Sequence, residues 1–193
     1  MEFEKKDGTI VRKLDKKNVD TGAGFERLLA VIQKKDNIFD TDIFDFIKAS
    51  IKKISDPEKF EANVKAYRIV ADHMRAATML ISDGAVPSNS DQGYIVRRLI
   101  RRAIRYADIL GIAPNNLSEI IFSVAETYKD TYPKIIKNIV DIKEVIAKEE
   151  EKFRKTLESG LKELRKVAVS NNEGIIQTQA LNGKELFNLY STY

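Results

Sequence analysis

The longest regular pattern in this sequence runs from Pro133 to about Val167 and repeats at the spacing of an α-helix. A proline stands at its start, where a helix tolerates it, and apolar residues follow at gaps of three, four or seven positions, which keep one helix face. These apolar positions are Ile135, Ile139, Ile142, Ile146, Phe153, Leu157, Leu161 and Leu164. Because a helix buries such a stripe only against other helices or a sheet, a mainly α fold is predicted.

Shorter helical patterns precede and follow the long one. The sequence from Ser55 to Glu58 resembles a capping box with an early proline and predicts a helix that continues to about Ile81. An amphipathic pattern precedes it, with Ile43, Phe44, Ile47 and Ile51 on one face. Further helices are predicted up to Gly111, from about Leu117 to Lys129, and in the closing segment NGKELFNLYSTY.

Strand signals are confined to the beginning of the chain. The first 19 residues alternate loosely and contain the turn dipeptide Asp7-Gly8, which predicts a β-hairpin. After residue 37 these signals largely stop. We therefore expect a small α+β part at residues 1–36, followed by a helical domain at residues 37–193.

The composition excludes several classes of function. The 193 residues are 43% hydrophobic and 32% charged, which is typical of a globular protein. The absence of cysteine excludes disulfides and thiolate chemistry, and a single histidine leaves a zinc site without its usual ligands. No metal site is therefore expected. No apolar run reaches the roughly 18 residues of a membrane helix and no signal peptide is recognised, so a cytoplasmic location is expected.

Five arginines lie within nine positions in the segment RRLIRRAIR. At about 100° per residue they occupy an arc of about 140°, and apolar residues fill the opposite side of the same helix. The arginines are Arg97, Arg98, Arg101, Arg102 and Arg105. Two interpretations stay open: contact with a nucleic acid, whose phosphates suit the planar guanidinium, or ion pairs with acidic residues of the fold. Nucleic-acid contact is favoured, because lysine would suffice for solubility.

A second candidate site is the glycine-flanked turn DTGAGFER. Gly22 and Gly24 leave the backbone bare, and Arg27 follows near the start of a helix, which suits an anionic group. A lone GxG taken by itself is more typical of a structural turn, and neither a P-loop nor a Rossmann fingerprint is present. His73 is interpreted as a core or hydrogen-bonding histidine. No residue is predicted to act as a general acid or base.

Taken together, these segments resemble one family. NVDTGAGFERL resembles the third signature motif of class II aminoacyl-tRNA synthetases, in the form found in alanyl-tRNA synthetases. The block from YRIVADHMRAA to RRLIRRAIRYADILG resembles the tRNA-recognition region of that family, and EEEKFRKTLESGLKEL and GKELFNLYSTY match its next two landmarks in order. The resemblance covers nearly the whole chain. It implies a remnant of a catalytic domain followed by a helical tRNA-recognition domain.

The resemblance also implies roles for individual residues. Asp20 would hold the α-amino group of alanine and Gly22 would line that pocket. Gly24 and Arg27 would contact ATP. Asn89 would read the G·U pair in the acceptor stem of alanine tRNA, with an acceptor oxygen available to the exocyclic amine of G, while the five arginines would lie against that stem.

One position departs from the family pattern. The family usually has LYDTYGFP, whose aspartate reads the G·U pair together with the asparagine, whereas Ser191 stands here in LYSTY. Serine can still form a hydrogen bond, but it brings no negative charge and a shorter reach. We therefore expect Ser191 to lie at the tRNA, and two interpretations stay open: a changed readout of G·U, or a tolerated substitution.

The implied function is part of an alanine–tRNA ligase. The full enzyme would use ATP and magnesium to activate alanine and then transfer it to alanine tRNA. We expect this chain to be a fragment, with the first two signature motifs upstream and a zinc-containing editing domain downstream, and to lack activity alone. The alternatives are a helical RNA-binding module without catalysis and a purely structural helical domain, whose arginines would be paired with acidic residues.

Overall fold

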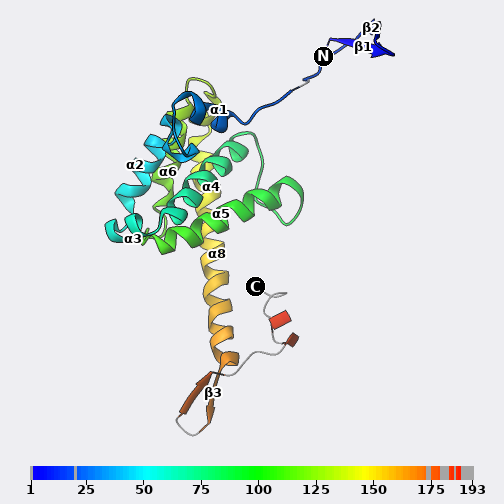
Figure 1. Cartoon of the computed structure of the whole chain (residues 1–193). Helices are drawn as coiled ribbons and strands as arrows, with labels where there is room; N and C mark the ends of the chain where they lie inside the picture. Colours follow the sequence, from blue (N-terminus) through cyan, green and yellow to red (C-terminus); the bar gives the residue numbers. More distant parts are fainter. Residues whose placement is uncertain (1, 20, 173–174, 179–182, 185, 188–193) are drawn as a thin grey trace. The chain divides into compact units, whose positions relative to one another are not determined.

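The structure is a computed structural model of the chain. It describes every residue except 1, 20, 173–174, 179–182, 185 and 188–193 (Figure 1). The chain divides into two compact units, Met1–Asp45 and Phe46–Tyr193. The boundary between the units therefore lies nine residues later than the end of the predicted first domain at residue 36. That domain boundary stays a prediction.

The first unit begins with the predicted β-hairpin. Strands β1 (Phe3–Lys6) and β2 (Thr9–Lys13) pair antiparallel, and Asp7 and Gly8 join them with φ values of 52° and 81°. Positive φ at both central residues is the geometry that Asp-Gly favours in a two-residue hairpin turn. The prediction of a hairpin is thus confirmed.

The rest of the first unit is helical. Helix α1 spans Phe25–Ile32, and two short 3-10 helices follow, η1 (Ile38–Asp40) and η2 (Asp42–Phe44). The Asn37 side chain caps η1 by accepting a hydrogen bond from the Phe39 amide, 2.9 Å away. Contacts between α1 and η1 group these elements together.

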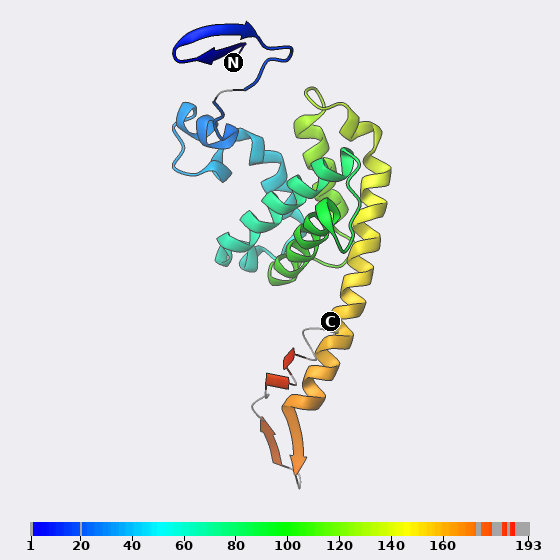
Figure 2. The ribbon, with the colours of Figure 1, turned by 90° about the vertical axis from the view of Figure 1, so that its right-hand side faces the viewer.

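The second unit consists mainly of helices. They are α2 (Asp45–Ile54), α3 (Pro57–Ala62), α4 (Val64–Ser82), α5 (Asp91–Ile109), α6 (Leu117–Tyr128), α7 (Lys134–Lys137) and α8 (Ile139–Ala168). A hairpin of β3 (Val169–Asn172) and β4 (Ile175–Thr178) follows α8. Figure 2 shows α8 as one continuous helix that extends beyond the other helices to this hairpin. The prediction of a mainly α fold with a small α+β part is confirmed.

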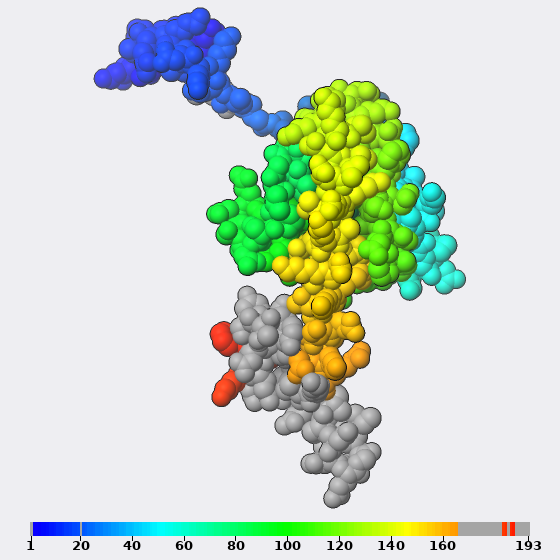
Figure 3. Space-filling view, turned by 180° about the vertical axis from the view of Figure 1, so that it is seen from behind, coloured from blue at the N-terminus to red at the C-terminus, as the bar shows by residue number. Residues whose placement is uncertain are grey.

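The core lies between α4 and α5, with α6 and the first half of α8 packed against them. Figure 3 shows that half of α8, in yellow, covering one face of the other helices. The apolar face predicted for the arginine helix is buried there except at Leu99, which is partly exposed. Its buried residues include Val96, Ile100, Ala103, Ile104 and Ala107. Burial of this stripe fixes which face α5 turns to solvent.

Two predicted helices are interrupted in the structure. The helix expected from Ser55 to Ile81 breaks at Asn63, whose φ and ψ are −122° and 59°, and Asp56 caps its first part by accepting from the Lys59 amide at 3.0 Å. The long helix breaks at Asn138, between α7 and α8, whereas Gly160 does not interrupt it. Asparagine side chains compete locally for backbone hydrogen bonds, which explains the break at Asn63, whose side-chain nitrogen donates to Lys59 O at 2.8 Å. At Asn138 the side-chain nitrogen instead donates to Ser82 O at the end of α4, 3.2 Å away, so this break is tied to a tertiary contact.

Two differences concern the C-terminal part. Strand β3 occupies Val169–Asn172 and β4 occupies Ile175–Thr178, where the sequence predicted only a break beginning at VSNNEG. Four-residue strands offer too few positions for a period of two to show in the sequence. Of the predicted closing helix, residues 183–184 and 186–187 are helical and the others lie outside the described residues.

Candidate nucleic-acid interface

The loop between α4 and α5 is defined by a glycine at its start. Gly84, at φ 101°, ends α4 in the left-handed region that favours glycine. Its N–H donates to Ile81 O at 2.9 Å, and the N–H of Ala85 donates to Leu80 O at 3.0 Å. These two bonds satisfy carbonyls at the end of α4 and turn the chain sharply. The loop that carries Asn89 begins directly after this turn.

A second glycine brings the loop onto α5. A β-carbon at Gly93 would overlap the carbonyl oxygen of Val86 and the hydroxyl of Ser88. The Ser88 hydroxyl also donates to Ser90 O at 2.9 Å. Only glycine allows the loop to lie this close to the first turn of α5. Gly93 therefore sets the position of Asn89.

Asn89 and Arg97 contact each other across this turn. The side-chain oxygen of Asn89 accepts a hydrogen bond from an Arg97 guanidinium nitrogen, and that guanidinium lies 5.6 Å from the ring centroid of Tyr94. Because arginine only donates, the oxygen of the carboxamide must face it. The Asn89 nitrogen is thus the group left to donate to a ligand, whereas the sequence analysis had assigned the contact to the oxygen.

Arg101 alone of the five arginines forms an ion pair with a described carboxylate. Its Nε lies 2.6 Å from Glu149 Oε1 on α8, and its guanidinium lies 5.1 Å from the ring centroid of Phe153. The Glu149 side chain is only 8% exposed, so its charge needs this partner. Of the two interpretations of the arginines, Arg101 therefore fits the second, an ion pair with an acidic residue of the fold. The pair joins α5 to α8.

Arg98, Arg102 and Arg105 are exposed on α5. Within the described part of the chain, none of them is within ion-pair distance of a carboxylate, although Arg102 lies 5.9 Å from the ring centroid of Tyr106. Like charges on one helix face repel one another unless an anion offsets them. A purely structural account of the arginine helix therefore explains Arg101 but leaves these three without a role.

A small hollow lies between α4 and α5 beside these arginines. It has a volume of about 240 Å³ and is lined by His73, Ile95, Arg98, Leu99 and Arg102. His73 Nδ1 lies 3.0 Å from Asp72 Oδ2, which confirms the predicted role of a hydrogen-bonding histidine.

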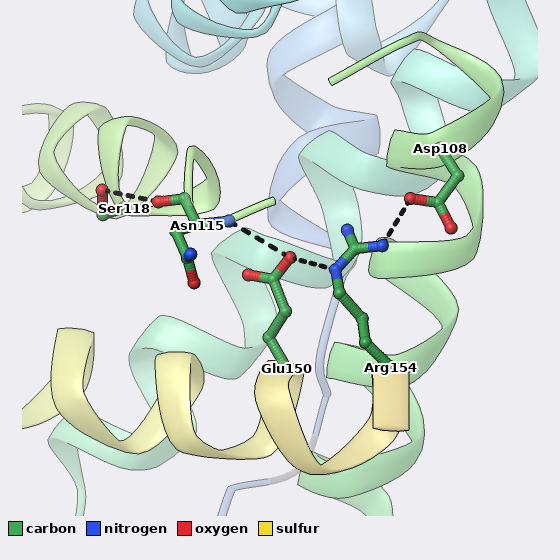
Figure 4. A network of polar contacts seen from close by, with 5 residues as sticks. All are labelled: Asp108, Asn115, Ser118, Glu150 and Arg154. Carbon is green, nitrogen blue, oxygen red and sulfur yellow. Dashed lines mark hydrogen bonds and ion pairs between the residues drawn. The ribbon is translucent and has the colours of Figure 1, made fainter. Parts of the chain in front are cut away.

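The position of α8 is fixed by a second polar network (Figure 4). Arg154 on α8 donates to Glu150 Oε1 and to Asp108 Oδ1 on α5, each at 2.8 Å. Glu150 is almost fully buried and also accepts from the Asn115 amide at 3.4 Å. Burial lowers the pKa of Arg154, but its hydrogen bonds to Asp108 and Glu150 outweigh this and raise the pKa overall. The network holds the end of α5 in register with α8.

The glycine-flanked turn is described only in part. Gly24 is the N-cap of α1 and provides no side-chain cap, so the positive end of the α1 helix dipole begins at a bare glycine. Arg27 is exposed and its Cδ lies 3.4 Å from the place of a Gly24 β-carbon. The structure thus brings Gly24 and Arg27 together, while Gly22 lies in open space. Asp20, like Ser191, lies outside the described residues.

Three contributions to the site were missed by the sequence analysis. Glu149 looked like any acid in an EEEK run, and only its burial against Arg101 distinguishes it. Gly93 carried no signal beyond being a glycine near a helix start. The stacking of Tyr94 on Arg97 could have been anticipated from their i,i+3 spacing.

Within the described residues, no group of three or more acidic or histidine side chains is arranged to hold a metal ion. None of the described helices combines the length and apolarity needed to cross a membrane.

The fold and the sequence together define the class of protein. A model of the family described as tRNA synthetases class II (A) matches residues 1–193, and the chain belongs to this family. The class that was predicted from the motifs is therefore confirmed.

Individual relatives narrow the resemblance to alanine–tRNA ligases. The chain is 42% identical over 192 residues to the alanine–tRNA ligase of Bacillus velezensis, which is 97% of this chain and 21% of that protein. It is 40% identical over 189 residues to that of Bacillus subtilis and 36% identical over 192 residues to that of Endomicrobium trichonymphae. These matches cover 97% and 100% of the chain, but 21% and 22% of the two relatives. The chain thus spans about a fifth of their length.

Proposed function

We propose that this chain is part of an alanine–tRNA ligase and that its helical unit binds the acceptor stem of alanine tRNA. The observation that carries the proposal is the solvent face of α5. Its three exposed arginines have no carboxylate partner among the described residues, and Asn89 lies at the start of the same face. The relatives supply the substrate, since all those named above are alanine–tRNA ligases.

The arginines and Asn89 would divide the work of recognition. Arg98, Arg102 and Arg105 would contact phosphates, which sets affinity and register without reading sequence. Asn89 would reach the shallow minor groove of the A-form stem. Because Arg97 occupies its side-chain oxygen, Asn89 either donates to a groove acceptor or exchanges Arg97 for the exocyclic amine of G. Ser191 would contribute from the C-terminal segment.

The first unit would contribute to the site for alanine and ATP. Gly24 and Arg27 fit a triphosphate, because the N-terminus of α1 and an exposed guanidinium lie together at this glycine. Asp20 would hold the amino group of alanine beside Gly22. ATP with magnesium supplies the activated phosphate, and these residues would position and neutralise the reactants rather than transfer protons. A cytoplasmic location accords with this role.

The proposal is tested by binding the 193-residue chain to an RNA hairpin that contains the acceptor stem of alanine tRNA. Replacing Arg98, Arg102 and Arg105 singly by glutamine should weaken binding and reduce the salt slope by about one for each lost phosphate contact. Lys53→Gln removes the same charge from an exposed position in the last turn of α2 and should leave the slope unchanged.

Comparing the affinities for the G·U and G·C versions of the hairpin separates base-pair recognition from sequence-independent phosphate binding. A preference for G·U that disappears in Asn89→Ala assigns the readout to the loop before α5. Absence of any salt-dependent RNA binding by the chain would contradict the proposal. Loss of binding in Lys53→Gln equal to that in Arg105→Gln would show that only net charge matters.

A helical RNA-binding module without catalysis is the second candidate, and it shares the α5 face. ATP distinguishes the two. If the first unit serves a synthetase, isothermal titration of the chain with Mg-ATP should show binding that Arg27→Gln weakens about tenfold, whereas an RNA-binding module would bind no ATP.

A further inference from the structure

The hollow between α4 and α5 combines three chemically distinct walls. Arg98 and Arg102 provide guanidiniums, Ile95 and Leu99 provide an apolar wall, and His73 provides an imidazole. Ligand pockets of drug size occupy about 300–1,000 Å³. At about 240 Å³ the hollow is suited to a smaller group, on the scale of a sugar and its phosphate.

The proton on His73 is placed by its neighbour. Hydrogen bonding from His73 holds the pKa of Asp72 below its ordinary value, and the charges of Arg75 and Arg102 contribute in the same direction. An ionised carboxylate only accepts, so the Nδ1 atom, 3.0 Å from Asp72 Oδ2, carries the proton. In a neutral imidazole Nε2 is then an acceptor, and no described residue donates to it.

The two arginines offer the complementary chemistry. Guanidiniums only donate, and a phosphate group accepts in the planar geometry that they favour. A ligand of this hollow must therefore carry an anion for Arg98 and Arg102 and a donor for His73. A ribonucleotide of an RNA backbone has both, because its phosphate accepts and its 2′-hydroxyl donates. A deoxyribonucleotide lacks the donor.

We propose that the hollow binds one ribose-phosphate unit of an RNA strand, with Arg98 and Arg102 on the phosphate and His73 Nε2 accepting a hydrogen bond from the 2′-hydroxyl. The proposal rests on the proposed function, because it takes the α5 face to lie on RNA. It adds a specific site on α4 that distinguishes RNA from DNA.

The first test uses the fact that His73 is the only histidine of the chain. A nitrogen-15 spectrum of the free protein, recorded at a pH where the imidazole is neutral, should show the ring proton on Nδ1. Adding the acceptor-stem hairpin should shift Nε2 to the value of a hydrogen-bonded acceptor. A ring protonated at Nε2 in the free protein, or an Nε2 signal unchanged by saturating RNA, would overturn the proposal.

The second test locates the hydroxyl. The hairpin is prepared with single 2′-deoxy substitutions, which leave the rest of the stem as RNA. One position should lower the affinity of the unchanged protein about fivefold, the loss expected for a single neutral hydrogen bond. His73→Phe, which keeps a ring but no acceptor, should weaken binding of the unmodified hairpin to the same extent and no longer respond to that deoxy position.

The controls distinguish failure of this inference from failure of the proposed function. Arg105 lies on the same helix outside the hollow. Arg105→Gln should therefore lower the affinity for all hairpins equally and keep the fivefold loss at the 2′-deoxy position. His73→Gln, which can present an oxygen acceptor, should recover part of the response. If His73→Phe still binds RNA and still loses affinity fivefold at that 2′-deoxy position, the inference alone is overturned. If the unchanged protein does not bind RNA at all, the proposed function itself is overturned.

Discussion

Gly93 shows how a single missing side chain arranges a site. Its bare α-carbon is where the Val86 carbonyl and the Ser88 hydroxyl approach α5. We expect Gly93→Ala to lower the free energy of unfolding by about 1–3 kcal/mol, because backbone cannot yield as a flexible side chain can. Urea denaturation measures this loss. Gly22→Ala is the matched control, since nothing lies within 4 Å of its β-carbon, and an equal loss there would refute the explanation.

A second prediction at this scale concerns acid. Hydrogen bonding from His73 lowers the pKa of Asp72, so ionised Asp72 stabilises the folded state above its unfolded pKa. That contribution is lost as the pH falls below about 3.8 and through the lower folded pKa. Asp72→Asn should therefore be less stable at pH 6, and the difference should shrink toward pH 2. Thermal melts across this range would contradict the prediction if the difference grew on acidification.

At the scale of elements, α5 and α8 are held together by buried acids. Arg101→Gln would leave Glu149 without its partner, and we expect a loss of about 2–4 kcal/mol, less than the full cost of a buried charge because Arg101 is partly exposed. Replacing both residues by leucine should restore most of the stability. Denaturant titration of the single and double variants checks this, and a double variant no more stable than Arg101→Gln would contradict it.

The same element explains why the arginines could not be assigned from the sequence. Their common face was predicted from the period of α5, and the structure places all five along that helix. Which of them is internal depends on where α8 crosses, and Glu149 is 48 residues away from Arg101. Spacing along a helix predicts which residues share a face, but it does not predict which other element packs against that face.

At the scale of the whole molecule, an exposed stretch of chain lies within the first unit, between the hairpin and α1. Lys16 and Lys17 are exposed and lie between β2 and α1, outside any described helix or strand. Limited trypsin digestion should therefore cut there before it cuts α4, α5 or α6, whose backbones are locked in helices. Mass spectrometry of the first products tests this, and early cleavage after Arg98 or Arg102 would contradict it.

Local rules within the sequence determined much of this protein. The Asp7-Gly8 turn, the apolar stripes of α5 and α8 and the termination of α5 by Gly111 follow from backbone sterics and helical period, which act over a few residues. The motifs were sufficient to predict the family, because their residues are fixed in order and type.

Only the tertiary structure decided which side chains these elements bury and which contacts they form with one another. It buried Glu149 and Glu150, fixed the side-chain oxygen of Asn89 on Arg97 and placed His73 of α4 beside Arg98 and Arg102 of α5. It also broke the long predicted helix at Asn138, whose side chain donates to Ser82 O of α4. Burial and desolvation arise when distant segments exclude water from each other, so the strength and role of a charge depend on packing that no short stretch of sequence contains.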